Sequence, residues 1–195
     1  NLYNFLTSVV QNPDKSYIMA GYGINLAQYE LDFIKTDSTG SVLWARRYYS
    51  PIILASDYYQ LGKLIRTSDG GYILCGTRKT DGFIMKLDAN GGVSWSRAYY
   101  FSGASSHFLN NIKQTSDGGY IAVGYMRNLS TDSLDAFIVK ITNNGTLSWG
   151  GRWNNQTTNS DDAFLDVEED QGSGFIAVGY TSQVFGSDTS WDALI

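Results

Sequence analysis

The sequence has little cysteine, histidine or proline, and each shortage excludes a class of structure or site. Of its 195 residues, one is cysteine (Cys75), one is histidine (His107) and two are proline. A single cysteine rules out an intramolecular disulfide and any cysteine-based metal cluster. A histidine without a second imidazole or a suitable cysteine cannot anchor a usual zinc site. We therefore expect no cofactor.

Basic charge and long apolar segments are also lacking. The chain has 14 lysine and arginine residues against 19 aspartate and glutamate residues, a formal net charge of -5. Because phosphate binding needs a basic face, this balance argues against a nucleic-acid partner. No apolar run approaches the length that crosses a bilayer, so we expect no membrane insertion.

Glycine and tyrosine are abundant instead, with 21 and 14 residues, and 43% of the chain is hydrophobic. Many tight turns joined by aromatic-rich strands would have this composition. An internal repeat of about fifty residues confirms that the chain is periodic. Its most regular part is an aromatic and apolar run that closes on glycine, at residues 16–21, 71–76, 119–124 and 174–179.

Each repeat divides into four short segments. The first carries an apolar pair, which is Leu6 and Val9, Leu61 and Leu64, Leu109 and Ile112, or Phe164 and Val167. Asp-Gly steps at 69–70 and 117–118 then predict primed hairpin turns. The second segment is the glycine-closed run, the third contains Lys35, Lys86 or Lys140, and the fourth contains a tryptophan nine residues later, Trp44, Trp95 or Trp149.

Four strands with short connections predict an antiparallel meander. The second strand is apolar at nearly every position, which indicates burial on both faces. Sheets stacked between similar sheets meet that condition, and propeller blades are stacked in this way. We expect the closing glycine to let neighbouring sheets approach closely. The predicted fold is an all-β propeller of about four repeats, each a four-stranded antiparallel blade.

We expect one domain over residues 1–195, with blades at about 1–54, 55–103 and 104–158. An incomplete blade follows at about 159–195, because the fourth repeat stops inside its third strand at 192–195. An exposed strand edge invites pairing with another chain. The chain is therefore expected to be part of a larger propeller, to associate with itself, or to have its open blade completed by another chain.

The strings Thr-Ser-Asp-Gly-Gly-Tyr at 67–72, Phe-Ile-Met-Lys-Leu-Asp at 83–88 and Gly-x-x-x-Trp at 91–95 are similar to the β-propeller repeats of large secreted or surface proteins of bacteria, archaea and ciliates. That resemblance implies extracellular binding, adhesion or structural display. The segment 37–44, Asp-Ser-Thr-Gly-Ser-Val-Leu-Trp, also resembles the tryptophan-docking repeats of quinoprotein dehydrogenases. It has one residue fewer between Asp and Gly, and Cys75 alone cannot form the vicinal cysteine pair of many such enzymes.

Loop lengths suggest where a ligand would bind. Connections between the second and third strands vary in length and those between blades are long, and in a propeller these two classes of loop share one face. Aromatic and arginine side chains there suit sugar stacking or protein contacts. The alternative is that they pack under their own loops. The candidates are Tyr29, Tyr58, Tyr59, Arg78, Tyr100, Phe101, His107, Arg127 and Trp191.

Other repeated residues have a binding and a structural interpretation. A carboxylate starts each third strand and would form either a ring for a hard cation or a hydrogen-bond acceptor for its own turn; these are Glu30, Asp81, Asp135 and Asp192. Glycosylation sequons begin at Asn128, Asn144 and Asn155. The tryptophan series is expected in packing, Cys75 as a small buried hydrophobe, and the lysine series with its ammonium groups in water.

These observations favour a non-enzymatic module of a secreted or surface protein that contacts other proteins or a matrix. A glycan-binding lectin that uses the aromatic loops is the alternative. A quinone-dependent dehydrogenase-like propeller is the third hypothesis.

Overall fold

The computed structural model describes residues 3–25, 28–49, 58–154, 160–170, 174–185 and 188–194. All regular structure within these residues is β-strand, arranged as four antiparallel sheets, which confirms the all-β prediction. None of the described residues forms a helix with the length and hydropathy that crossing a membrane requires.

Sheet A contains β1 (Tyr3–Gln11), β2 (Tyr17–Asn25), β3 (Gln28–Thr36) and β4 (Val42–Tyr49). Sheet B contains β5 (Tyr59–Arg66), β6 (Tyr72–Arg78), β7 (Asp81–Leu87) and β8 (Val93–Tyr99). Sheet C contains β9 (Ala104–Gln114), β10 (Tyr120–Asn128), β11 (Leu134–Ile141) and β12 (Leu147–Trp153). Sheet D contains β13 (Asp162–Glu169), β14 (Phe175–Phe185) and β15 (Asp188–Leu194).

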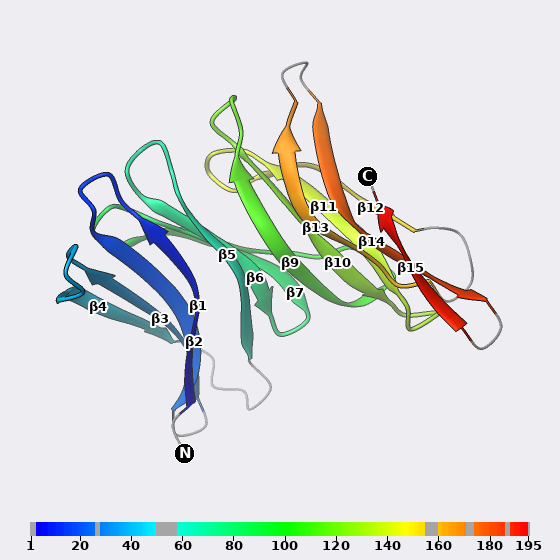
Figure 1. Ribbon diagram of the computed structural model, residues 1–195, viewed down its shortest axis with the longest axis horizontal. Coiled ribbons are helices and arrows are strands. Elements are labelled where there is room, and N and C mark those ends of the chain that lie inside the picture. The colour runs from blue at the N-terminus through cyan, green and yellow to red at the C-terminus, as the bar shows by residue number, and fades with distance from the viewer. Residues whose placement is uncertain are drawn as a thin grey trace.

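Each repeat folds as its own sheet. Strands pair in chain order in all four, so every sheet is a meander. Sheet D has three strands among the described residues and is the incomplete blade that the sequence predicts. The sheets follow one another along the molecule, with sheet A at one end and sheet D at the other (Figure 1).

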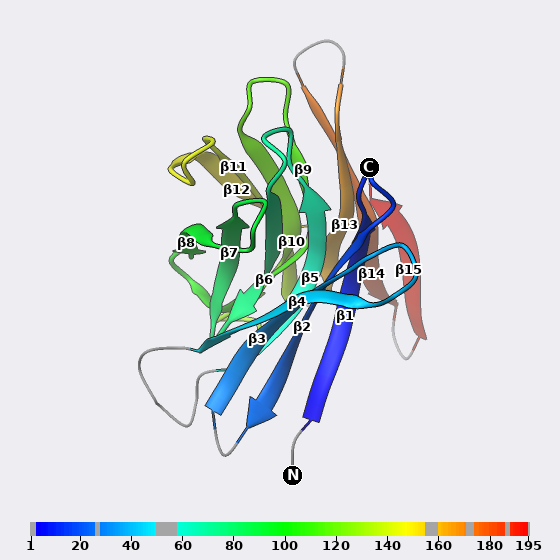
Figure 2. The same cartoon turned by 90° about the vertical axis from the view of Figure 1, so that its left-hand side faces the viewer.

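The first strand of each sheet makes the contact with the sheet before it. Strand β5 packs on β1 and β2, β9 packs on β5, β6 and β7, and β13 packs on β9, β10 and β11. Viewed from the end, sheet A stands in front of the others (Figure 2). The described sheets form an open arc, consistent with blades of a propeller but without closure.

The second strands show why the sheets must stack. In β6, Tyr72 and Leu74 are buried in the core shared with sheet A, whereas Ile73 and Cys75 are buried in the core shared with sheet C. Alternate side chains of one strand therefore fill two different interfaces. Cys75 is the small buried hydrophobe that we expected, and burial raises the pKa of its thiol to about 12.

The closing glycines have a different role from the one predicted. A Cβ at Gly124 would lie 1.8 Å from the carbonyl oxygen of Phe108 on β9, which is the adjacent strand of the same sheet. A Cβ at each of the other three closing glycines would also lie too close to a carbonyl oxygen of its own first strand, at 1.9 Å from Phe5, 2.2 Å from Gln60 and 1.8 Å from Ala163. A register shift in each first strand lies beside this contact. Glycine therefore accommodates a bulge within each sheet and does not separate two sheets.

Repeat-equivalent leucines allow the contribution of stacking to be measured. Leu109 of β9 is fully buried and Leu6 of β1 is 51% exposed, although both lie opposite the closing glycine of their sheet. We expect Leu109→Ala to lower the free energy of unfolding by about 2–5 kcal/mol, through lost burial and a cavity. Leu6→Ala should cost less than about 1 kcal/mol. Equal losses in urea denaturation would show that the two faces are not different environments.

Candidate functional site

Three of the aromatic loop candidates pack inside the molecule. Tyr59 is buried, and its ring lies edge-on to Phe83 with centroids 5.6 Å apart. Phe101 packs edge-on against Phe137 at 5.2 Å. Tyr29 is half-buried against the core between sheets A and B. These contacts support the packing interpretation for the three side chains.

His107 is buried and holds two loops together. Its Nε2 accepts a hydrogen bond from the backbone N–H of Phe101 at 2.9 Å, and its Nδ1 lies 3.1 Å from the carbonyl oxygen of Thr80. Satisfying both contacts requires a neutral ring with its proton on Nδ1, which donates to Thr80. The ring therefore joins the β8–β9 connection to the β6–β7 turn.

The remaining loop candidates do not converge on one surface feature. Arg127 is tied to its own turn, because its guanidinium donates to the carbonyl oxygen of Asp132 at 2.7 Å. Arg78 is half-buried at the end of β6. Tyr58 and Tyr100 are exposed, Tyr100 by 72%. Trp191 belongs to β15, but its side chain lies outside the described residues.

The carboxylates that start the third strands have polar partners within their own sheets. Glu30 is buried and lies 3.0 Å from Nε of Arg47. Burial raises the pKa of Glu30, Arg47 opposes the rise, and Asp32 adds to it. Asp135 accepts a hydrogen bond from Asn128 at 3.1 Å.

The two other carboxylates of the expected ring add no ligand set. Oδ1 of Asp81 lies 3.4 Å from Oγ1 of Thr80, and the side chain of Asp192 lies outside the described residues. No group of three or more potential metal ligands occurs in the part of the chain that the structure describes.

The three sequons differ in their surroundings. Asn128 is half-buried, and its side chain donates to Asp135 and accepts from the N–H of Ser130. Asn144 is exposed at the β11–β12 turn, where its Oδ1 accepts from Thr146. Asn155 lies outside the described residues.

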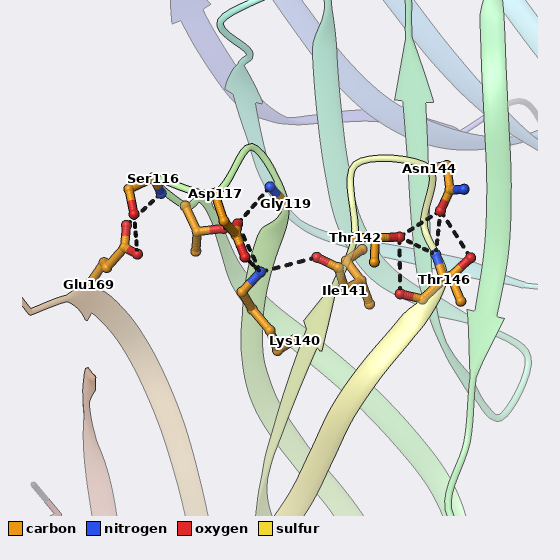
Figure 3. A network of polar contacts seen from close by, with 10 residues as sticks. Ser116, Asp117, Gly119, Lys140, Ile141, Thr142, Asn144, Thr146 and Glu169 are labelled. Carbon is orange, nitrogen blue, oxygen red and sulfur yellow. Dashed lines mark hydrogen bonds and ion pairs between the residues drawn. The ribbon is translucent and has the colours of Figure 1, made fainter. Parts of the chain in front are cut away.

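In sheets B and C the repeated lysine forms an ion pair with the aspartate of the Asp-Gly turn. We call this contact the turn lock. Lys140 is buried, and its Nζ lies 2.8 Å from Oδ2 of Asp117 and 3.3 Å from the carbonyl oxygen of Ile141 (Figure 3). Oδ1 of Asp117 accepts from the hydroxyl of Thr115 at 2.5 Å and the N–H of Gly119 at 2.8 Å.

Sheet B repeats this lock with Lys86 and Asp69, 2.8 Å apart. The expectation that these ammonium groups stay in water is therefore wrong for Lys86 and Lys140, because each is buried and forms an ion pair with a turn carboxylate. The primed-turn prediction is also wrong. Positive φ is found at Gly70 and Gly118 but not at the aspartates before them.

The lock lowers the pKa of both aspartates. At Asp117 the hydrogen bonds from Lys140, Thr115 and Gly119 lower the pKa from 3.8 to about 2. At Asp69 desolvation by burial raises the pKa, but the hydrogen bonds from Lys86, Thr67 and Gly71 outweigh it, and the pKa is again about 2. The ionised carboxylates therefore stabilise the folded state.

A second repeated contact joins the fourth strand of one sheet to the last turn of the next sheet. From β8, Nε1 of Trp95 donates to the carbonyl oxygen of Asn143 at 3.2 Å, and the hydroxyl of Tyr99 donates to that of Gly145 at 2.7 Å. From β4, the hydroxyl of Tyr48 donates to the carbonyl oxygen of Gly91. Strands β4 and β8 thus supply donors for a turn in the following sheet.

The turn that receives these donors needs glycine. Gly145 has a φ of 81°, and a Cβ on it would lie 2.9 Å from ring carbons of Trp95. Gly91 has a φ of 82°, and its Cβ would lie 2.9 Å from the ring of Trp44. Backbone conformation and the adjacent indole both exclude a larger residue.

Two equivalent clefts lie between neighbouring sheets, beside the tryptophans of the fourth strands. The cleft between sheets B and C has a volume of about 430 Å³ and is lined in part by Trp95, Asn143 and Asn144. The cleft between sheets C and D has a volume of about 710 Å³ and is lined in part by Trp149 and Phe175. The β11–β12 turn of sheet C contributes Asn143 and Asn144 to the lining of the cleft between sheets B and C.

The outer faces of sheets A and D expose residues that the repeat buries elsewhere. Leu6 and Val9 of β1 are 51% and 59% exposed, whereas Leu61 and Leu64 of β5 are buried, as are Leu109, Ile112 and Val167 of the later first strands. Ile176 and Val178 of β14 are 53% and 42% exposed. Their equivalents facing the following sheet are fully buried, at Ile18, Ala20, Ile73, Cys75, Ile121 and Val123.

We call the exposed surface formed by Leu6 and Val9 the leading face, and the exposed surface formed by Ile176 and Val178 the trailing face. Sequence reasoning placed the functional surface on loops and did not identify these faces. The signal was present in the apolar pairs of the first strands, which recur in the first repeat although it has no described sheet before it.

Acid should weaken the turn locks. Above pH 3.8 the contribution of Asp117 is complete, and it is lost as the pH falls toward its folded pKa of about 2. We expect Asp117→Asn to remove about one titrating group from the acid-dependent fall of the unfolding free energy. Denaturation from pH 2 to 5 would measure this. Asp69→Asn should act alike, and an unchanged pH dependence in both variants would contradict the assignment.

Alanine at two glycines separates turn conformation from packing. Gly145 and Gly40 both have positive φ, but a Cβ at Gly40 meets nothing within 4 Å. Gly40→Ala should therefore cost about 1–2 kcal/mol of stability from backbone strain alone. Gly145→Ala should cost at least about 1 kcal/mol more, because it overpacks against Trp95. Urea denaturation measures both losses of stability. Equal losses would show that the Trp95 ring moves away from the added Cβ at no cost.

Comparisons with known proteins support the fold alone. No family model matches the sequence, and no curated protein matches it. Among solved structures, the crystal structure of a protein of unknown function from Bacteroides caccae is similar, with a TM-score of 0.54 and 11% sequence identity. The alignment covers 98% of this chain and 61% of that one, so this chain spans less than two thirds of its length.

Proposed function

We propose that the chain is a non-enzymatic structural and binding module of a secreted or cell-surface protein. It acts through protein contacts at its two outer sheets. The observation that carries the proposal is the exposure of the leading and trailing faces. Both consist of residues whose equivalents are buried in the three interfaces between described sheets.

The chemistry of these faces favours another β-sheet as the partner. At the leading face, Leu6 and Val9 occupy the positions with which Leu61 and Leu64 meet sheet A. At the trailing face, Ile176 and Val178 occupy the positions with which Ile121 and Val123 meet sheet D. The trailing face therefore has apolar residues at the same positions as the surface of sheet C that the first strand of sheet D contacts.

Exposed apolar patches of this kind mark interaction sites in soluble proteins. In repeat architectures each unit is stabilised by its neighbours, so an uncovered terminal face favours association with a similar unit. Because the two faces differ, the contact between chains is head-to-tail, and each chain can give one contact and receive one.

Mixing two single-face variants tests this proposal. We expect the wild-type chain to associate in a concentration-dependent manner in sedimentation equilibrium. The double variants L6K/V9K and I176K/V178K should each be monomeric, because a charge in an apolar interface is costly. An equimolar mixture should form a 1:1 dimer, because one variant keeps an intact trailing face and the other an intact leading face.

The control is Leu129→Lys, since Leu129 is 66% exposed on the β10–β11 turn, away from both faces. It should associate like the wild type. Far-UV circular dichroism confirms that each variant is folded. A wild-type chain that stays monomeric at all concentrations, or a mixture that does not dimerise, would contradict a function through these faces.

A further inference from the structure

The cleft between sheets C and D lacks a contact that the two earlier sheet pairs make. Strand β4 donates to the β7–β8 turn of sheet B, and β8 donates to the β11–β12 turn of sheet C. Strand β12 is the third donor strand in this series. The described part of sheet D ends with β15 and offers no turn to receive it.

Two tryptophans of β12 are left exposed as a result. Trp149 is equivalent to Trp95, and Trp153 is equivalent to Tyr99. Tyr99 is 6% exposed beneath its turn, whereas Trp153 is 39% exposed and Trp149 is 45% exposed. Neither indole N–H has a hydrogen-bond partner within the described residues, although Trp95 uses its own on the carbonyl oxygen of Asn143.

The volume of the cleft agrees with a missing turn. The cleft between sheets B and C has Asn143 and Asn144 in its lining and a volume of about 430 Å³. The equivalent cleft between sheets C and D has no such residues in its lining and a volume of about 710 Å³. Trp149 forms a wall there with Phe175, their ring centroids 5.9 Å apart.

The adjoining edge of sheet D can pair with a strand. In sheets B and C the third strand, β7 or β11, pairs on one side with the second strand and on the other with the fourth. Strand β15 pairs with β14 alone among the described strands. Unpaired N–H and C=O groups of an edge strand bind an extended segment by β-augmentation.

We propose that this cleft and the outer edge of β15 together bind an extended segment that begins in an Asx-Gly turn. The segment pairs antiparallel with β15, its turn glycine packs on the ring of Trp149, and turn carbonyl oxygens accept from the two indole N–H groups. Glycine is required because a Cβ at the equivalent Gly145 would lie 2.9 Å from the ring of Trp95.

The proposal is separate from the head-to-tail contact. It uses the β12 tryptophans and a strand edge, whereas the proposed function uses the leading and trailing faces. The variants that test one site do not change the other, so either can fail alone.

A peptide with the chain's own sequence of residues 88–99, Asp-Ala-Asn-Gly-Gly-Val-Ser-Trp-Ser-Arg-Ala-Tyr, is the probe, because this segment occupies the equivalent place in sheet B. Labelled with fluorescein and titrated with the full chain, it should give saturable fluorescence anisotropy. Trp149→Ala and Trp153→Ala should each weaken binding by about tenfold, the size expected for a buried aromatic anchor. Leu129→Lys should leave it unchanged.

Two further variants keep the test decisive. Trp149→Phe and Trp153→Phe retain an aromatic ring but remove the indole donor, and each should weaken binding a few-fold even if an alanine variant fails to fold. A peptide carrying Gly91→Val should bind at least about tenfold more weakly, because the side chain would meet the indole. The proposal is overturned if the peptide does not bind, if Gly91→Val binds equally well, or if binding ignores both tryptophans.

Discussion

Stability here depends on burying the second strands between neighbouring sheets, on both faces in sheets B and C. A strand such as β6 places Tyr72 and Leu74 toward one neighbour and Ile73 and Cys75 toward the other. A single sheet cannot bury both sets, so the repeat is not a stable unit by itself. The hydrophobic effect therefore acts along the stack, and each sheet is held mainly by the sheets beside it.

Polar contacts at the ends of the strands set how one sheet lies on the next. The turn lock fixes the shape of the β5–β6 and β9–β10 turns, and each of these two turns also contacts the following sheet. Ser116 beside the lock donates to the carboxylate of Glu169 in sheet D, and Ser68 donates through its N–H to Gln114 in sheet C. The repeated signature at these turns thus serves both the turn and the interface.

The equivalent turn of sheet A, between β1 and β2, does not make this contact. Pro13 stands where sheets B and C have the donating serine, and proline has no N–H. The equivalent of the acceptor in the following sheet is Arg66, which is not an acceptor. Sheets A and B instead share the hydrogen bond from the Tyr72 hydroxyl to Oδ1 of Asn12, 2.9 Å long. Donor and acceptor have both been replaced, so neither is left unpaired.

A stacking repeat has consequences at its ends. The apolar side chains that hold sheets A and B together recur on the leading face, and those that hold C and D together recur on the trailing face. The donors of the fourth strands recur at Trp149 and Trp153. Under both proposals the chain binds its partners by continuing its internal interfaces. The loop candidates His107 and Tyr59 contribute internal packing instead.

The sequence by itself determined the fold class, the repeated antiparallel sheets and a last sheet with three strands among the described residues. These follow from local signals, namely turn residues, apolar runs and a fifty-residue period, which act within each repeat. The role of the closing glycines, the burial of Lys86 and Lys140, and the inward packing of four loop candidates (Tyr29, Tyr59, Phe101 and His107) were decided only by the tertiary structure. Each depends on which groups from distant segments come into contact. The same is true of the exposed faces, because Leu6 and Leu109 have equivalent places in the repeat and differ only in whether another sheet covers them.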